Sequence, residues 1–146
     1  VTVLGDYDGG SHEAELVSFR NELESEGYYA SLIKDLPAHP SQSLPQKVKM
    51  WCLTSRFVVL IDRDPSGHIR EYTELAKEDI ALALLKEVDT GSTYMIGHEH
   101  HTDDYVELFE FNKIPNEKTR AVIDWAEQFI EDISELYARE YPWRNE

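Results

Sequence analysis

The feature that most constrains the fold is an uninterrupted apolar run at residues 57–61, which reads Phe-Val-Val-Leu-Ile. β-Branched and aromatic side chains favour strands. A strand whose residues do not alternate between polar and apolar must be covered on both faces, as happens in parallel sheets with crossover helices on both sides. The run therefore predicts a central strand of a parallel α/β sheet.

Strand and helix patterns alternate along the rest of the chain. Strands are expected at 1–5, 28–33, 57–61, 93–96 and 105–111, and helices at 12–26, 45–55, 68–84 and 116–141. The order β-α-β-α-β-α-β-β-α predicts an α/β fold: a flavodoxin-like three-layer sandwich around a mostly parallel five-stranded sheet of order 2-1-3-4-5. Ligands of such sheets bind at the carboxyl ends of the strands where the order reverses, here between the first and third strands.

Helical spacing also assigns the inward faces of two helices. One face is shared by Val48, Trp51, Cys52 and Ser55, and another by Val122, Trp125, Phe129, Ile133 and Leu136. A tryptophan and a cysteine at helical spacing indicate packing, so neither Trp51 nor Cys52 is assigned to a site.

The acidic balance limits the classes of partner. The 146 residues suit a single domain spanning 1–146, and 14 Lys+Arg against 29 Asp+Glu give a net charge of −15. Nucleic acids and anionic membranes are bound through clustered Lys and Arg, so neither is an expected partner. The single cysteine and the lack of a long apolar segment favour the cytoplasm. A start at Val1 without Met is consistent with a domain excised from a longer protein.

Two loops follow the strands that flank the expected ligand site. The first begins at Gly5, Asp6 and Tyr7, which are candidates for holding a base or a ribose. The second begins at Asp62 and contains Ser66 and Gly67 in a tight turn that allows close approach to a ligand.

A helix that starts near His68 would present its free N–H groups to an anion such as phosphate. Glu71 falls in the first turn of that helix and faces the same mouth as Asp62. Paired carboxylates at this edge can bind ribose hydroxyls, stabilise an oxocarbenium ion or act as a nucleophile. As simpler roles, Glu71 can complement the helix dipole and Asp62 can form a turn.

The string from Pro65 to Glu71, PSGHIRE, resembles the loop-plus-Glu pattern of the TIR-like and nucleoside 2-deoxyribosyltransferase-like superfamily. Many members carry a Gly followed four residues later by a Glu at the start of the helix after the third strand, as Gly67 and Glu71 do. The resemblance covers the element order over most of the chain. Tyr72 and Thr73 stand where the transferases usually have Leu-Gly.

The resemblance implies a single TIR-like nucleotide-binding domain with NAD or a nucleoside as substrate and with no resident cofactor or metal. Glu71 would be the catalytic carboxylate that cleaves or transfers an N-glycosidic bond. The substrate-binding residues would be Gly5, Asp6, Tyr7, Asp62, Ser66, Gly67 and His68. TIR-like domains often act as assemblies, so the implied partners are a nucleotide or nucleoside ligand together with a second copy or other domains.

Other functions remain open. A non-catalytic TIR-like module that senses a nucleotide or mediates assembly in signalling or defence fits the same pattern. A receiver-like domain would use Asp62 as phosphoacceptor with Asp6 and Lys113, but leaves the Gly67–Glu71 spacing unexplained. The stretch GHEHHTDD at 97–104 is rich in His and acids, yet its spacing matches no standard zinc site, so a solvated loop is expected there.

Overall fold

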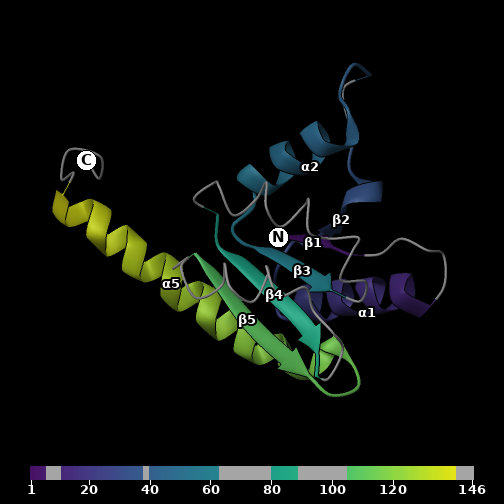
Figure 1. Ribbon diagram of the computed structural model, residues 1–146. Helices are drawn as coiled ribbons and strands as arrows, with labels where there is room; N and C mark the ends of the chain where they lie inside the picture. The colour runs from purple at the N-terminus through teal and green to yellow at the C-terminus, as the bar shows by residue number, and fades with distance from the viewer. Residues whose placement is uncertain (6–10, 38–39, 63–79, 89–104, 141–146) are drawn as a thin grey trace.

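The computed structural model describes residues 1–5, 11–37, 40–62, 80–88 and 105–140, and these form one parallel sheet with helices packed on it (Figure 1). The strands are β1 (Thr2–Leu4), β2 (Ser31–Leu32), β3 (Val58–Asp62), β4 (Leu82–Glu87) and β5 (Val106–Phe111). All neighbouring pairs are parallel and the order is β2-β1-β3-β4-β5. The predicted flavodoxin-like α/β fold is thereby confirmed.

Helices cover both faces of the sheet. The α-helices are α1 (Ser11–Ser25), α2 (Leu44–Leu53) and α5 (Thr119–Glu140), and the 3-10 helices are η1 (Ile33–Asp35) and η2 (Pro115–Lys118). Helices α1 and α5 share one core with the sheet, and α2 lies on the other core. The three-layer arrangement follows from this division.

Local sequence explains where two of these helices begin or end. Helix α1 is followed by Gly27, whose φ of +96° lies in the left-handed region that glycine adopts most easily. Helix α2 begins with a capping box, in which the Ser43 hydroxyl accepts from Gln46 N–H and the Gln46 side chain accepts from Ser43 N–H. Gly27 thus ends α1 before the connection into β2, and the capping box sets the residue at which α2 begins.

The side chains of β3 and β4 alternate between the two cores. The side chains that face α1 and α5 are Val59, Ile61, Ala83 and Leu85, and those that face α2 are Val58, Leu60, Leu82 and Leu84. All eight are buried. This is the two-sided coverage that the apolar run at 57–61 predicts.

The expected helix over 68–84 is wrong at its end, because residues 82–87 form β4. Leucine and alanine favour helices, and a short apolar run does not distinguish a buried strand from a buried helix. Residues 63–79 and the strand expected at 93–96 lie outside the described residues. The expected strand at 28–33 is shorter than predicted, since only Ser31 and Leu32 pair with β1 and the chain then turns into η1.

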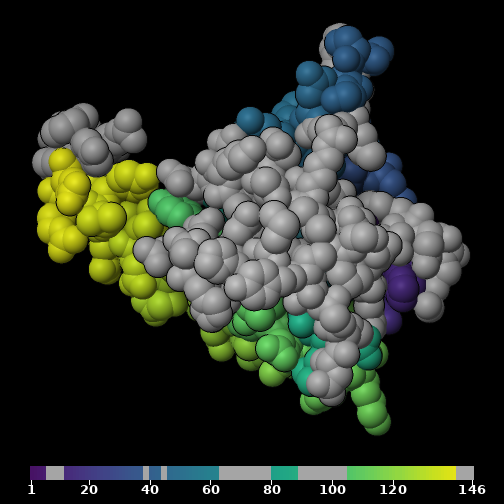
Figure 2. Space-filling model, in the orientation of Figure 1, coloured from purple at the N-terminus to yellow at the C-terminus, as the bar shows by residue number. Residues whose placement is uncertain are grey.

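The last turns of α5 extend past the sheet (Figures 1 and 2). Val122 is buried as expected, but Leu136 is 37% exposed and Tyr137 is 42% exposed, so the inward assignment of Leu136 is wrong. The apolar spacing of α5 continues past the point at which the helix leaves the sheet. None of the helices in the described ranges has the length and apolarity to cross a membrane.

Replacing Leu82 tests β4 directly. In a helix over 68–84, Leu82 would lie opposite the apolar face formed by Ile80, Ala83 and Leu84, and its loss would cost little. In the strand it is buried against α2. We expect Leu82→Ala to lower the free energy of unfolding by about 2–5 kcal/mol in urea titrations. Leu53→Ala, at a site 51% exposed, should change it by less than about 0.5 kcal/mol. A similarly small effect of Leu82→Ala would contradict the strand.

Candidate functional site

The carboxyl ends of β1 and β3 meet where the strand order reverses. Leu4 is in register with Leu60, so Gly5 leaves β1 beside the last residues of β3, Ile61 and Asp62. Gly5 and Asp62 are the two predicted site residues that lie within the described part of the chain, and the fold brings both to this edge.

Gly5 is required here by packing. A Cβ at this position would overlap the Leu16 side chain of α1 and lie 3.3 Å from the Ile61 carbonyl oxygen. Leu16 is buried and has little room to move. Glycine therefore lets α1 approach the ends of β1 and β3, and contact between Gly5 and a ligand remains a prediction.

Asp62 is a carboxylate at the end of a core strand and is only 2% exposed. It follows Val58 and Leu60 in the alternation, so its side chain lies on the α2 face of the sheet. Holding a carboxylate in such a position is costly unless it has polar or charged partners. A residue that served only to form a turn would more easily sit in solvent.

Asp62 heads a row of charges along the same edge. It is in register with Lys86 of β4, and Lys86 is in register with Glu110 of β5. Register partners in neighbouring parallel strands project to the same face, about 4.8 Å apart. The row therefore alternates in sign, from buried Asp62 through half-buried Lys86 to exposed Glu110.

The other predicted site residues, Asp6, Tyr7, Ser66, Gly67, His68 and Glu71, lie outside the described residues, and so does the His-rich stretch at 97–104. Their places in the site remain predictions. Within the part of the chain that the structure describes, no group of three or more His, Cys, Asp and Glu side chains could hold a metal ion.

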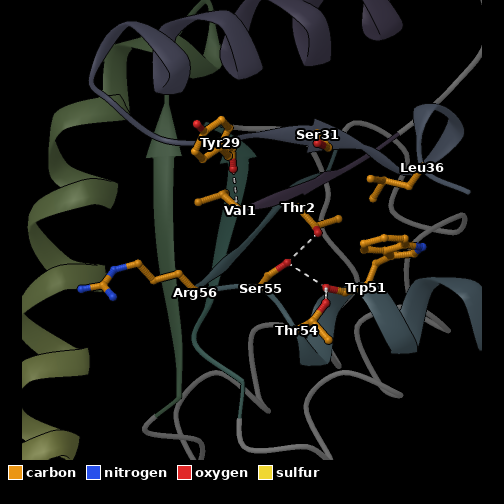
Figure 3. Close-up of a pocket in the computed structure, with 9 residues that line it drawn as sticks. All are labelled: Val1, Thr2, Tyr29, Ser31, Leu36, Trp51, Thr54, Ser55 and Arg56. Carbon is orange, nitrogen blue, oxygen red and sulfur yellow. Dashed lines mark hydrogen bonds between the residues drawn. The ribbon is translucent and has the colours of Figure 1, made fainter.

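The opposite, amino edge of the sheet carries a cavity of about 180 Å³ (Figure 3). Its lining residues are Val1, Thr2, Tyr29, Ser31, Leu36, Trp51, Thr54, Ser55 and Arg56. The Ser55 hydroxyl donates to the Trp51 carbonyl at 2.8 Å, so Thr2 is the donor in the 2.6 Å bond between the Thr2 and Ser55 hydroxyls. These bonds connect the end of α2 to the start of β1.

A second cavity of about 170 Å³ shares Ser55 and Arg56 with the first and is lined mainly by apolar side chains of α5 and of the segments that enter β4 and β5. Pockets for cofactors and drug-sized ligands usually hold about 300–1,000 Å³. Both cavities are smaller than a nucleotide site requires. The carboxyl edge is therefore the better candidate.

An ionic cluster beside these cavities joins α5 to the sheet. The Glu127 carboxylate accepts from Arg56 Nε at 2.8 Å and Nη2 at 2.6 Å, and from the Tyr28 hydroxyl at 2.7 Å. The bonds from Arg56, against the effect of burial, lower the pKa of Glu127 to about 2. Burial and the bond to Glu127 raise the pKa of Tyr28 to about 12. Sequence reasoning missed this cluster, whose role is to hold the amino edge together.

Glu127→Gln should reveal the contribution of this cluster to stability. Because the pKa of Glu127 is lower in the folded protein, the ionised carboxylate stabilises the fold. This contribution is complete at pH values above the ordinary pKa of 4.5 and is lost as the pH falls through about 2. Arg56 is 53% and Glu127 36% exposed, so solvent screening limits the effect at neutral pH to about 0.5–1 kcal/mol. Urea titrations should show the difference from wild type shrinking toward zero near pH 2.

The matched control is Glu131→Gln, which removes an exposed carboxylate from the same helix. We expect it to change the free energy of unfolding by less than Glu127→Gln does at neutral pH. Equal effects of the two variants would show that the cluster adds nothing beyond general charge.

Comparison with known proteins assigns no family to the chain. No protein-family model, no curated protein sequence and no solved structure matches it. The geometry of the sheet edge and the residues that occupy it therefore carry the functional argument.

Proposed function

We propose that this chain is a TIR-like domain that binds a nucleotide or nucleoside at the carboxyl edge of β1 and β3 and cleaves or transfers its N-glycosidic bond. The observation that carries the proposal is Asp62, a carboxylate 2% exposed at the end of β3 and next to the Gly5 end of β1. In sheets of this order that position is the usual ligand site. A carboxylate there is suited to accept hydrogen bonds from ribose hydroxyls.

The chemistry proposed for the site is displacement at the anomeric carbon of the ribose. As the bond from this carbon to the base nitrogen breaks, its electron pair leaves with the base and positive charge develops on the sugar. The Glu71 carboxylate would stabilise that charge or attack the carbon, and water or an acceptor base would complete the reaction. Nicotinamide leaves NAD as a neutral molecule, whereas the base of a nucleoside needs a proton. The role of Glu71 rests on its four-residue spacing from Gly67.

The burial of Asp62 bears on the receiver-like alternative. A phosphoacceptor must be reached by its phosphodonor, and a carboxylate that is 2% exposed is poorly placed for this. A hydrogen bond from a ribose hydroxyl also needs access to the Asp62 oxygens, so burial alone does not separate the two functions. The nucleotide-binding proposal is favoured by the four-residue spacing from Gly67 to Glu71, which a receiver-like domain leaves unexplained.

Glu71→Gln tests the proposed chemistry, since it keeps the size of the side chain and removes its charge. We expect the wild-type chain to release base from NAD or from a nucleoside and the variant to lose at least about 100-fold in rate, with ligand binding retained. Product release is followed by chromatography and binding by calorimetry. Glu135→Gln, an exposed position on α5, serves as control and should keep the full rate.

Two results would count against catalysis by Glu71. Equal turnover by wild type and Glu71→Gln would remove Glu71 from the mechanism. Binding of NAD or nucleosides by wild type without any product would favour the non-catalytic sensing module instead.

A further inference from the structure

The proposed site is negatively charged, which disfavours those of its expected ligands that carry phosphate. The chain carries a net charge of −15, and three carboxylates, Asp62, Glu87 and Glu110, lie near the carboxyl ends of β3, β4 and β5. A phosphate that approaches this edge would be repelled. A phosphorylated ligand needs a cation close to the site.

Lys86 is the only basic residue in the five described strands. Its register with Asp62 puts it on the strand next to β3, at the same edge and on the same face of the sheet. A lysine side chain is long enough to cross one strand spacing of about 4.8 Å, so its ammonium can reach over the end of β3. β3 is the strand that borders the proposed site.

Four other basic side chains of the described residues are engaged away from this edge. Arg20, Lys34, Arg56 and Arg120 each form an ion pair with a carboxylate. Within the described part of the chain no carboxylate forms an ion pair with Lys86, although it stands between Asp62 and Glu110 in the register. The Lys86 ammonium is therefore available at the carboxyl edge.

We infer that Lys86 binds a phosphate group of the ligand, and that the ligand class is a phosphorylated nucleoside rather than a neutral one. This inference rests on the proposed nucleotide-binding function and adds the substrate class to it. Lysine binds phosphate as a compact point charge with three N–H donors. Asp62 and Lys86 would then divide the ligand between them, with ribose hydroxyls on the carboxylate and phosphate on the ammonium.

The test compares nucleosides with their own monophosphates. Calorimetry on the full chain would use adenosine, guanosine, cytidine and uridine, their 5′-monophosphates, and NAD. We expect wild type to bind at least one monophosphate about tenfold or more tighter than its nucleoside, because a charged hydrogen bond contributes that much. The preference should decrease at high salt.

Three variants identify the source of the preference. Lys86→Gln should abolish it while leaving nucleoside affinity unchanged, and Lys86→Arg should keep most of it. Arg139→Gln removes one positive charge from the last turn of α5, which extends past the sheet (Figure 1), and should leave the preference intact. Thermal melting checks that each variant is folded.

The outcomes separate this inference from the function on which it rests. If wild type binds nucleosides and monophosphates equally, the role of Lys86 is overturned and the proposed function stands. If Lys86→Gln weakens both ligands equally and lowers the melting temperature, Lys86 only balances Asp62 and Glu110, and the inference again fails. If wild type binds none of these ligands, the proposed function itself is wrong.

Discussion

The burial of β3 and β4 on both faces is the constraint on which the rest of the structure depends. Eight side chains of these two neighbouring strands are divided between two cores. Each core is completed by helices packed on that face of the sheet. Because all the strands are parallel, each connection must cross back over the sheet, and α1 and α2 fill the crossovers from β1 to β2 and from β2 to β3. The same requirement leaves little room for polar groups inside the sheet, so they collect at its two edges.

The two edges differ in chemistry. At the amino edge, the polar groups satisfy one another and join the helices to the strand ends. Thr2 donates a hydrogen bond to Ser55, Ser55 donates one to the Trp51 carbonyl, and Arg56 forms an ion pair with Glu127. At the carboxyl edge, Asp62 is held in the core beside a lysine that has no carboxylate partner among the described residues. The first arrangement stabilises the fold, and the second is suited to bind a ligand.

The sheet could be predicted from the sequence because a strand that is buried on both faces consists of consecutive apolar residues, as at 57–61. It did not distinguish strand from helix at 80–85, where leucine and alanine suit both. Lys86 was not considered as a result, since the role proposed for it depends on its register with Asp62. The bond between Thr2 and Ser55 joins residues 53 apart in sequence, and no local pattern encodes such a contact. Gly5 and Asp62 could be placed at the carboxyl edge from the sequence because Gly5 follows one apolar strand and Asp62 ends another.

Nucleotide binding at the carboxyl edge of β1 and β3 is the proposal on which the roles of Glu71 and Lys86 depend. The most direct measurement is an NMR titration of ¹⁵N-labelled protein with NAD and with nucleoside monophosphates, followed through the backbone amides. We predict that the largest shifts fall at Gly5, Asp62 and Lys86. Shifts confined to Thr2, Trp51 and Ser55 would place the ligand at the amino edge and contradict the claim, as would a spectrum that no nucleotide changes.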